Sequence, residues 1–177
     1  MMATRLAALC CALSVTGAHG ADKQPLTPAR ALETTRIMMC MDAVGPSNPD
    51  GGVSLSPSGK RYVLRLVRGD VARNGVWMDV FTGALDTLES ARPKHVARLF
   101  TSGLGAGMGN FGSDMDVMEG WPLHWLSEHE VAFLWSTDAN VRQATRVNLD
   151  TGAVDRLTDH PTSVSLFDVA GDTVVYN

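Results

Sequence analysis

The amino-acid sequence predicts an all-β fold built from repeated units, and three observations lead to that prediction. Three segments, "VSLSPSGKRYVLRLV" (53–67), "HWLSEHEVAFLWS" (124–136) and "LFDVAGDTVVYN" (166–177), each place a short turn before an apolar run. These runs are rich in β-branched and aromatic residues, which favour strands. After the first 20 residues only one short segment has a helical pattern. We therefore expect a protein held together by sheet and by packing between sheets.

The composition is that of a folded domain. The 177 residues are enough for one domain and hardly for two. Apolar residues make up 45% and charged residues 19%, so a buried core can form. The formal net charge of −4 argues against a nucleic-acid partner, because nucleic-acid binders carry a basic face.

Residues 1–20 are predicted to be a secretory signal peptide. Arg5 precedes an apolar run over residues 6–15, and small residues lead to an expected cut before Ala21. This three-part order is typical of cleaved export signals, whereas a buried helix is the alternative reading. We therefore expect a periplasmic or secreted bacterial protein. No later apolar stretch reaches the length of about 18 residues that a span needs, so no membrane contact is expected after cleavage.

Cleavage would leave Cys40 as the only cysteine of the mature chain, because Cys10 and Cys11 lie in the signal peptide. A single cysteine makes no internal disulfide. Cys40 lies in the Met-rich stretch "RIMMCMDAV", where a small core residue is expected. A nucleophilic cysteine is the weaker alternative, since no neighbouring group supports it.

Residues 21–52 are predicted to hold a short helix and a loop. In "LTPARALETTRI", Thr27 is a suitable N-cap and Pro28 fits the first helical position. The helical pattern also places Leu32, Arg36 and Ile37 on an inward face. The stretch "GPSNPDGG" that follows has two prolines and three glycines, so it is expected to be a loop.

The first repeated unit begins at residue 53. Pro57-Ser58-Gly59 is expected to form a turn, and Tyr62–Val67 a strand. The polar turn "GDVARNG" follows. The segment "VWMDVFTGAL" then predicts a second strand, broken at residues 82–83 by Thr-Gly.

The second unit keeps the same order. "SEHEVAFLWS" predicts a turn and a strand, "TDANVRQ" a polar turn, and "ATRVNLDTGAVDRLT" a strand, a turn and a strand. The Thr-Gly pairs at 82–83 and 151–152 are 69 residues apart, and Pro57 and Ser127 are 70 apart. The third segment, which begins at residue 166, starts 42 residues after the second, which begins at residue 124.

A period of roughly 40–50 residues with several short strands in each unit is the signature of a β-propeller blade. We therefore expect residues 53–177 to form an incomplete β-propeller of about two to three blades. The Gly-rich segment at 101–122 lengthens the first unit and is expected to be a loop inserted between blades.

Three glycines, Gly107, Gly109 and Gly112, match the spacing G-x-G-x-x-G. A dinucleotide site would need a helix directly after them, inside a βαβ unit. "SDMDVMEGWP" follows instead, so a flexible loop is the expected reading.

Two groups of residues carry side chains that can bind metal ions. Asp114, Asp116 and Glu119 offer carboxylate oxygens, but the EF-hand spacing fails and a solvated acidic loop is favoured. His124 and His129 flank one turn, and no third ligand is visible beside them.

The tryptophans Trp121, Trp125 and Trp135 lie near one turn and strand. They are expected to fill the wedge between blades, with the lining of a substrate channel as the alternative. No serine lies in a G-x-S-x-G elbow, and no set of serine, histidine and aspartate can be assembled. The sequence therefore assigns no catalytic, cofactor-binding or metal-binding residue, and no cofactor is expected.

The segments "LTP", "VSLSPSGKRYVLRLV" and "VNLDTGAVDRLTDH" together resemble the N-terminal propeller of secreted serine peptidases of the prolyl-oligopeptidase family. The usual family turn is serine-proline-aspartate-glycine. Here Ser58 replaces the aspartate, and the second copy, "LSEHE", departs further. "DTG" followed by "RLT" is shared with TolB-like propellers. The export signal, the "RGDVARNG" turn and the Gly-rich insertion look most like the lasso-peptide isopeptidase branch, bacterial enzymes that open threaded lasso peptides.

This resemblance covers residues 25–177 and implies a following α/β-hydrolase domain that holds the catalytic serine, aspartate and histidine. The chain is then expected to be a truncated propeller part that gates or binds a peptide substrate, such as a lasso peptide. Alone, it is expected to be inactive. The third copy, which ends in "TVVYN", agrees with that expectation. Two alternatives stay open. One is a fragment of a TolB-like periplasmic propeller with a protein-binding role, and the other is a complete small β domain with a binding role.

Overall fold

The computed structural model describes residues 27–37, 53–102, 123–136 and 141–177. The chain divides into two compact units, residues 1–31 and 32–177, and each is described by itself. The described residues are mostly antiparallel strands, so the predicted all-β class is confirmed. No helix among them is both long and apolar enough to cross a membrane. The predicted signal peptide, Cys40, the "GPSNPDGG" loop and most of the Gly-rich insertion lie outside the described residues.

The helix predicted after the signal peptide is α2, Pro28–Leu32. Thr27 caps it as predicted, because its Oγ1 accepts a hydrogen bond of 3.2 Å from the Arg30 N–H. The prediction was wrong at the other end. Arg36 and Ile37 are not helical but form strand β1, Arg36–Ile37, which pairs with the first sheet. Two threonines precede β1, and β-branched residues at that point favour strand over helix.

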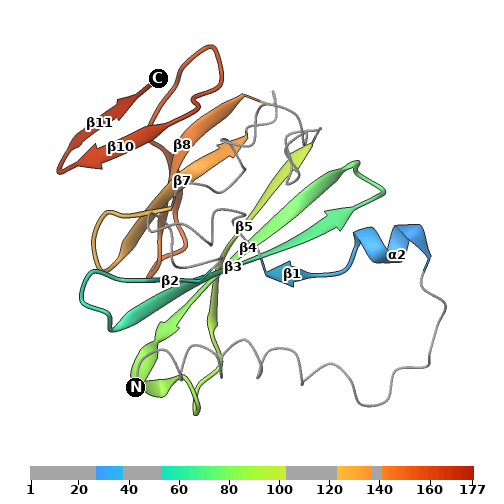
Figure 1. Ribbon diagram of the computed structural model, residues 1–177, viewed down its shortest axis with the longest axis horizontal. Coiled ribbons are helices and arrows are strands. Elements are labelled where there is room, and N and C mark those ends of the chain that lie inside the picture. Colours follow the sequence, from blue (N-terminus) through green and yellow to red (C-terminus); the bar gives the residue numbers. More distant parts are fainter. Residues whose placement is uncertain (1–26, 38–52, 103–122, 137–140) are drawn as a thin grey trace. The chain divides into compact units, whose positions relative to one another are not determined.

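The first sheet is antiparallel, and four of its strands follow one another in chain order (Figure 1). These strands are β2 (Val53–Leu55), β3 (Arg61–Asp70), β4 (Gly75–Ala84) and β5 (Lys94–Ser102). The short strands β1 and β2 lie along the same edge of β3, β1 against residues 66–67 and β2 against residues 62–64. The 3-10 helix Leu85–Thr87 begins the connection from β4 to β5.

The break predicted at Thr82-Gly83 does not occur, because β4 runs through both residues. The Thr82 hydroxyl donates a 2.8 Å hydrogen bond to the Tyr62 carbonyl across the sheet. Gly83 pairs with Tyr62, and the tyrosine ring lies over it. The glycine is therefore a site of close approach within a strand, not a turn. Likewise Thr101 and Ser102 belong to β5, so the Gly-rich insertion begins later than predicted.

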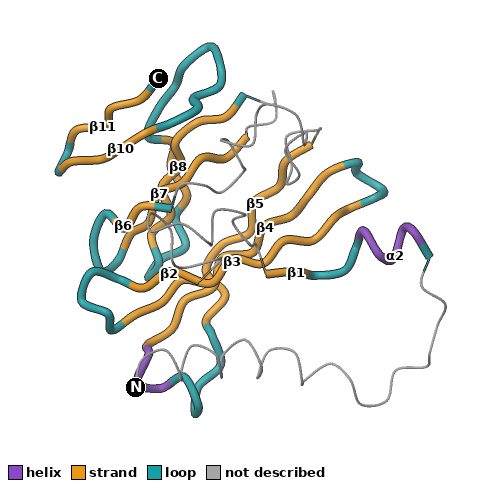
Figure 2. Tube along the Cα trace, viewed as in Figure 1, coloured by secondary structure: helices purple, strands orange, loops and turns teal. Residues whose placement is uncertain are grey.

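The second sheet repeats the four-strand order of the first. Its strands are β6 (His124–Trp125), β7 (Glu130–Ser136), β8 (Arg142–Asn148) and β9 (Val154–Arg156). A hairpin follows, formed by β10 (Phe167–Ala170) and β11 (Thr173–Tyr176). In Figure 2, loops and turns join β3 to β4 and β10 to β11. The structure therefore has the predicted succession of blade-like units.

One of the two landmarks of the repeat is a true structural match. Pro57 and Ser127 both lie in turns before the second strand of their sheets. The Thr-Gly pairs do not match, because Gly83 lies in β4 whereas Gly152 lies in the turn after β8 with φ +78°. Gly152 is needed there for its left-handed backbone.

Apolar side chains form two clusters. The first lies between the two sheets and comprises residues of β3, β4, β5, β7 and β8, with Leu149 of the turn that follows: Val63, Met78, Val80, Ala97, Leu99, Val131, Phe133, Trp135, Val147 and Leu149. The second lies between the other face of the second sheet and the hairpin, together with the segment that precedes the hairpin: Ala132, Leu134, Ala144, Val164 and Phe167. The second sheet is thus covered on both faces, as expected of a blade with two neighbours.

Candidate functional site

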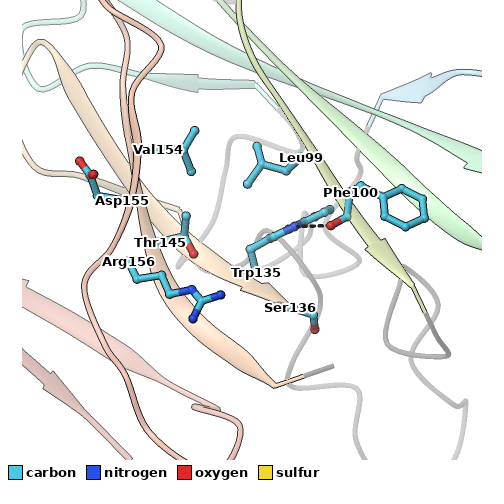
Figure 3. Close-up of a pocket in the computed structure, with 8 residues that line it drawn as sticks. All are labelled: Leu99, Phe100, Trp135, Ser136, Thr145, Val154, Asp155 and Arg156. Carbon is cyan, nitrogen blue, oxygen red and sulfur yellow. Dashed lines mark hydrogen bonds between the residues drawn. The ribbon is translucent and has the colours of Figure 1, made fainter. Parts of the chain in front are cut away.

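The candidate site is a pocket of about 260 Å³ between the first and second sheets (Figure 3). Side chains from four strands line it: Leu99, Phe100, Trp135, Ser136, Thr145, Val154, Asp155 and Arg156. The pocket lies where β5, the last strand of the first sheet, faces β7, β8 and β9 of the second. It is therefore a product of packing two blade-like units against each other.

Trp135 fixes one wall of the pocket. Its side chain is almost fully buried within the first apolar cluster, and its indole N–H donates a 3.3 Å hydrogen bond to the Phe100 carbonyl (Figure 3). Trp125 packs against the same cluster and donates a 3.0 Å bond to Ser54 Oγ. The predicted wedge role of these two tryptophans is confirmed, while Trp121 lies outside the described residues.

The polar side of the pocket carries an arginine without an acceptor. The Arg156 guanidinium points toward Ser136 and Thr145 (Figure 3), and no described residue accepts a hydrogen bond from it. Asp155, its neighbour in β9, instead accepts a 3.2 Å hydrogen bond from Arg146 Nη2. Leu99 of β5 and Val154 of β9 provide apolar surface in the same pocket. The pocket can therefore receive a group with an anionic end and an apolar body.

The repeated turns of the two sheets are joined by a carboxylate. Glu128, in the turn of the second sheet, accepts 2.8 Å hydrogen bonds from both the backbone N–H and the hydroxyl of Ser58, in the turn of the first. The Ser56 hydroxyl and the Ser58 N–H together hold the pKa of Glu128 below its ordinary value. Ser58 of the first sheet thus binds the turn of the second sheet.

A second set of contacts extends this junction. Arg61 Nη1 donates to the Glu128 carbonyl at 2.9 Å and to Asp150 Oδ1 at 3.1 Å. His129 Nδ1 lies 2.5 Å from Asp150 Oδ2, and this bond is the main cause of a lowered pKa of Asp150. Lys94 Nζ donates a 2.7 Å bond to the Asp150 carbonyl. We call Ser58, Arg61, Glu128, His129 and Asp150 the inter-sheet junction.

His124 lies apart from His129, so the structure does not bring the two histidines together. Its ring contacts Phe167 with centroids 4.8 Å apart, and its Nδ1 lies 3.8 Å from Asp168 Oδ1. Burial lowers the pKa of His124. The described residues contain no group of three or more histidine, cysteine, aspartate or glutamate side chains that could hold a metal ion. His124 is instead a contact between the second sheet and the hairpin.

An additional ionic cluster, on the first sheet, was not predicted from the sequence. Asp79 of β4 accepts bonds of 2.7 Å from His95 Nε2 and of 2.6 and 3.0 Å from Arg98. Burial alone would raise the pKa of Asp79, but the hydrogen bonds from Arg98 and His95 outweigh it and lower that pKa. This cluster depends on the pairing of β4 with β5, which places Asp79 opposite Arg98, and that register was not predicted from the sequence.

The other residues considered from the sequence lie outside the described residues. They are the glycines of the G-x-G-x-x-G match and the acidic residues that follow it: Gly107, Gly109, Gly112, Asp114, Asp116 and Glu119.

The fold and the site together define a partial, propeller-like β domain with a small pocket between adjacent sheets. No family model matches the sequence, and no curated protein does. Among solved structures, the chain is similar to the AtxE2 isopeptidase without ligand, with a TM-score of 0.57 and 15% identity over 88% of this chain and 23% of that one. It is also similar to an AtxE2 variant with Astexin3-dC4 bound, with a TM-score of 0.57 and 14% identity over 86% of this chain and 23% of that one. The chain thus spans about a quarter of the length of these isopeptidases.

Proposed function

We propose that this chain is the N-terminal propeller part of an exported serine peptidase of the prolyl-oligopeptidase family, most like the lasso-peptide isopeptidases. In this role it binds or gates a peptide substrate for an α/β-hydrolase domain, which carries out the hydrolysis. The observation that carries the proposal is the structural likeness to AtxE2 over 88% of this chain. The sequence resemblance noted above points to the same branch independently.

The described residues support a binding role. The pocket between the sheets is lined by an arginine, hydroxyl groups and apolar side chains, which are groups that bind peptides. The described serines of the repeated turns are engaged in structural contacts, since Ser56 Oγ accepts from the Arg61 N–H and Ser58 binds Glu128. Chemistry at a scissile bond is therefore assigned to the hydrolase domain.

The first test is the gene sequence beyond codon 177. We expect it to encode a G-x-S-x-G elbow, followed by an aspartate and a histidine in that order. A sequence that continues only with further blades would contradict the peptidase proposal and would support a protein-binding propeller.

The second test measures peptide opening. The full-length product is incubated with a lasso peptide and with its unthreaded linear form, and the products are identified by mass spectrometry. We expect the threaded peptide to be opened, and the reaction to be lost when the elbow serine is replaced by alanine. No turnover is expected from residues 21–177 alone. Hydrolysis by that segment which disappears on mutating one of its own serines would refute the proposal.

Export is tested separately. Expression in a bacterium with a periplasm, followed by N-terminal sequencing of the periplasmic protein, should give a first residue at or within a few positions of Ala21. Recovery of the chain only from the cytoplasm, with its first residues intact, would contradict export.

A further inference from the structure

We propose that the pocket between the two sheets binds the carboxylate of an extended peptide, that Arg156 is the residue that recognises this carboxylate, and that strand β9 pairs with the peptide backbone. This inference rests in part on the proposed function, because that function supplies a peptide as the ligand. The proposal itself stands on three features of the described residues: an unengaged guanidinium, an apolar wall and an open strand edge.

The guanidinium is the first feature. Arg156 points into the pocket beside Ser136 and Thr145 (Figure 3), and it makes no hydrogen bond or ion pair with a described residue. The other arginines near it differ, since Arg146 binds Asp155 and approaches Glu130. A guanidinium has five donors in a planar fork that matches the two oxygens of a carboxylate. Arg156 is therefore free to bind an anionic group from outside the chain.

The apolar wall sets the size and character of the group beside the carboxylate. Leu99, Val154 and the ring of Trp135 line the pocket, whose volume is about 260 Å³. This volume is below the range of about 300–1,000 Å³ that is usual for drug-sized ligands. It suits one apolar side chain together with a carboxylate. A peptide that ends in an apolar residue carries an apolar side chain and a carboxylate on the same residue, so both can enter the pocket together.

The third feature is the open edge of β9. On the side that faces β8, the Asn148 N–H donates to the Ala153 carbonyl at 2.9 Å, and the Leu157 N–H donates to the Ala144 carbonyl at 2.7 Å. Antiparallel strands bond through alternate residues, so the backbone groups of Val154 and Arg156 point toward the other side. Among the described strands β9 pairs only with β8, and all three of its residues are exposed. An extended peptide can add to such an edge by main-chain hydrogen bonds.

Binding measurements test the proposal. The probe is dye-labelled glycyl-glycyl-leucine with a free C-terminal carboxylate, titrated into the full chain and followed by fluorescence anisotropy. Two comparison peptides distinguish a C-terminal carboxylate from a side-chain carboxylate. The first is the same peptide with a C-terminal amide, which has no carboxylate. The second is that amide with a glutamate in place of the second glycine, which has only a side-chain carboxylate. We expect the acid to bind at least about ten-fold more tightly than the simple amide, as loss of a charge-assisted hydrogen bond predicts. Tighter binding of the glutamate peptide than of the acid would assign the pocket to acidic side chains.

Variants locate the site. Arg156→Gln is expected to weaken binding of the acid about ten-fold or more, and Arg156→Lys to weaken it less, because lysine keeps the charge but loses the fork. The matched control is Arg92→Gln, an exposed arginine outside the pocket that changes the net charge by the same amount. It should leave binding unchanged. Circular dichroism establishes that each variant is folded. The indole N–H signal of Trp135 in an NMR spectrum should shift on titration with the acid, because this group hydrogen bonds at the pocket wall.

Each outcome bears on the proposal. Equal binding of acid and amide, or equal losses in Arg156→Gln and Arg92→Gln, would overturn it. If the full-length product opens lasso peptides normally with Arg156→Gln and the short acid does not bind, the pocket assignment fails while the proposed function holds. If the acid binds through Arg156 but no hydrolase domain is encoded, the pocket holds and the peptidase proposal fails.

Discussion

Gly83 faces Tyr62 across the first sheet with no room for a side chain. A Cβ atom at Gly83 would lie 2.5 Å from Tyr62 Oη and 2.7 Å from Cζ. Because Tyr62 is buried, its ring has little freedom to move away. We predict that Gly83→Ala lowers the free energy of unfolding by about 1–3 kcal/mol, the usual cost of overpacking, as measured by urea denaturation. In a Tyr62→Leu background the same change should cost less. An equal cost in both backgrounds would show that the ring is not responsible.

His124 gives a prediction for pH. Its pKa is about 6.5 in an unfolded chain and is lowered in the fold by burial, which outweighs the opposite effect of Asp168. On acidification below about pH 6.5 the unfolded chain therefore takes up this proton first, and stability falls until the pH is below the folded pKa. The carboxylates with lowered pKa values also reduce stability on acidification, but they do so at more acidic pH, near and below the ordinary pKa of a carboxyl group.

The measurement compares urea midpoints at pH 7.5 and pH 5.5. The unmodified chain should lose more stability over this interval than His124→Phe. Equal pH dependence in His124→Phe and the unmodified chain would refute this role of His124.

Single residues were predictable from the sequence where their function is local. The Thr27 cap depends on the residues next to it, and the burial of Trp135 follows from its place in an apolar run. The Asp79–Arg98 ion pair was not predictable, because these residues are opposite each other only once β4 and β5 take their register. That register also shifts between Val80 and Phe81.

At the scale of elements, the inter-sheet junction joins the turns of the two sheets. Arg61, at the start of β3, contacts Glu128 and Asp150, and about a fifth of its side chain is exposed. We predict that Arg61→Ala destabilises the chain by about 1–2 kcal/mol, since hydrogen bonds to a charged group are lost, and part of that effect is screened by solvent. The measurement is thermal unfolding at low and high salt.

Arg68→Ala is the matched control for this prediction. Arg68 lies on the same strand but is exposed, and its side chain makes no hydrogen bond to a described residue of the second sheet. Its replacement should change stability by less than about 0.5 kcal/mol. A loss as large as that of Arg61→Ala would mean that strand composition, not the junction, is responsible.

Most strands were predictable from their apolar runs, which are rich in β-branched and aromatic residues, while two details of the elements were not. A glycine at position 83 predicts a break in the strand, whereas Gly83 lies within β4 and leaves room for the Tyr62 ring. The same residue pair at 151–152 does form a turn, because Gly152 adopts a positive φ. The same two residues therefore have different structural roles at 82–83 and at 151–152. Aligning the two sheets on these pairs places a strand of the first sheet against a turn of the second.

At the scale of the whole molecule, the hairpin presents apolar surface. Val175 is 64% exposed and Tyr176 is 44% exposed, and β11 pairs only with β10 among the described strands. Open strand edges with apolar side chains promote association. We predict that the chain self-associates with rising concentration, and that Val175→Lys reduces this association. Size-exclusion chromatography with light scattering provides the measurement. A monomer at every concentration would contradict the prediction. Asp172→Asn, which also makes the net charge one unit more positive, is the control for the change of charge alone.

The overall architecture was predictable because similar turns and apolar runs recur in the sequence. The pocket was not predictable from the sequence. Its lining comes from β5, β7, β8 and β9, and these residues meet only when two sheets pack together. Arg156 in particular has the surroundings of an ordinary surface arginine in the sequence, and only its direction in the fold makes it a candidate ligand-binding residue.

The two apolar clusters have a consequence for how stability is distributed. The second sheet contributes residues to both clusters, whereas the first sheet and the hairpin each contribute to one. Such an arrangement behaves as a one-dimensional series of units coupled to nearest neighbours. The central unit then opens only when two couplings are lost, and the hairpin when one is lost. Amide hydrogen exchange should accordingly be slowest in β7 and β8 and fastest in β10 and β11, and a ligand held between the two sheets should slow exchange in both of them together.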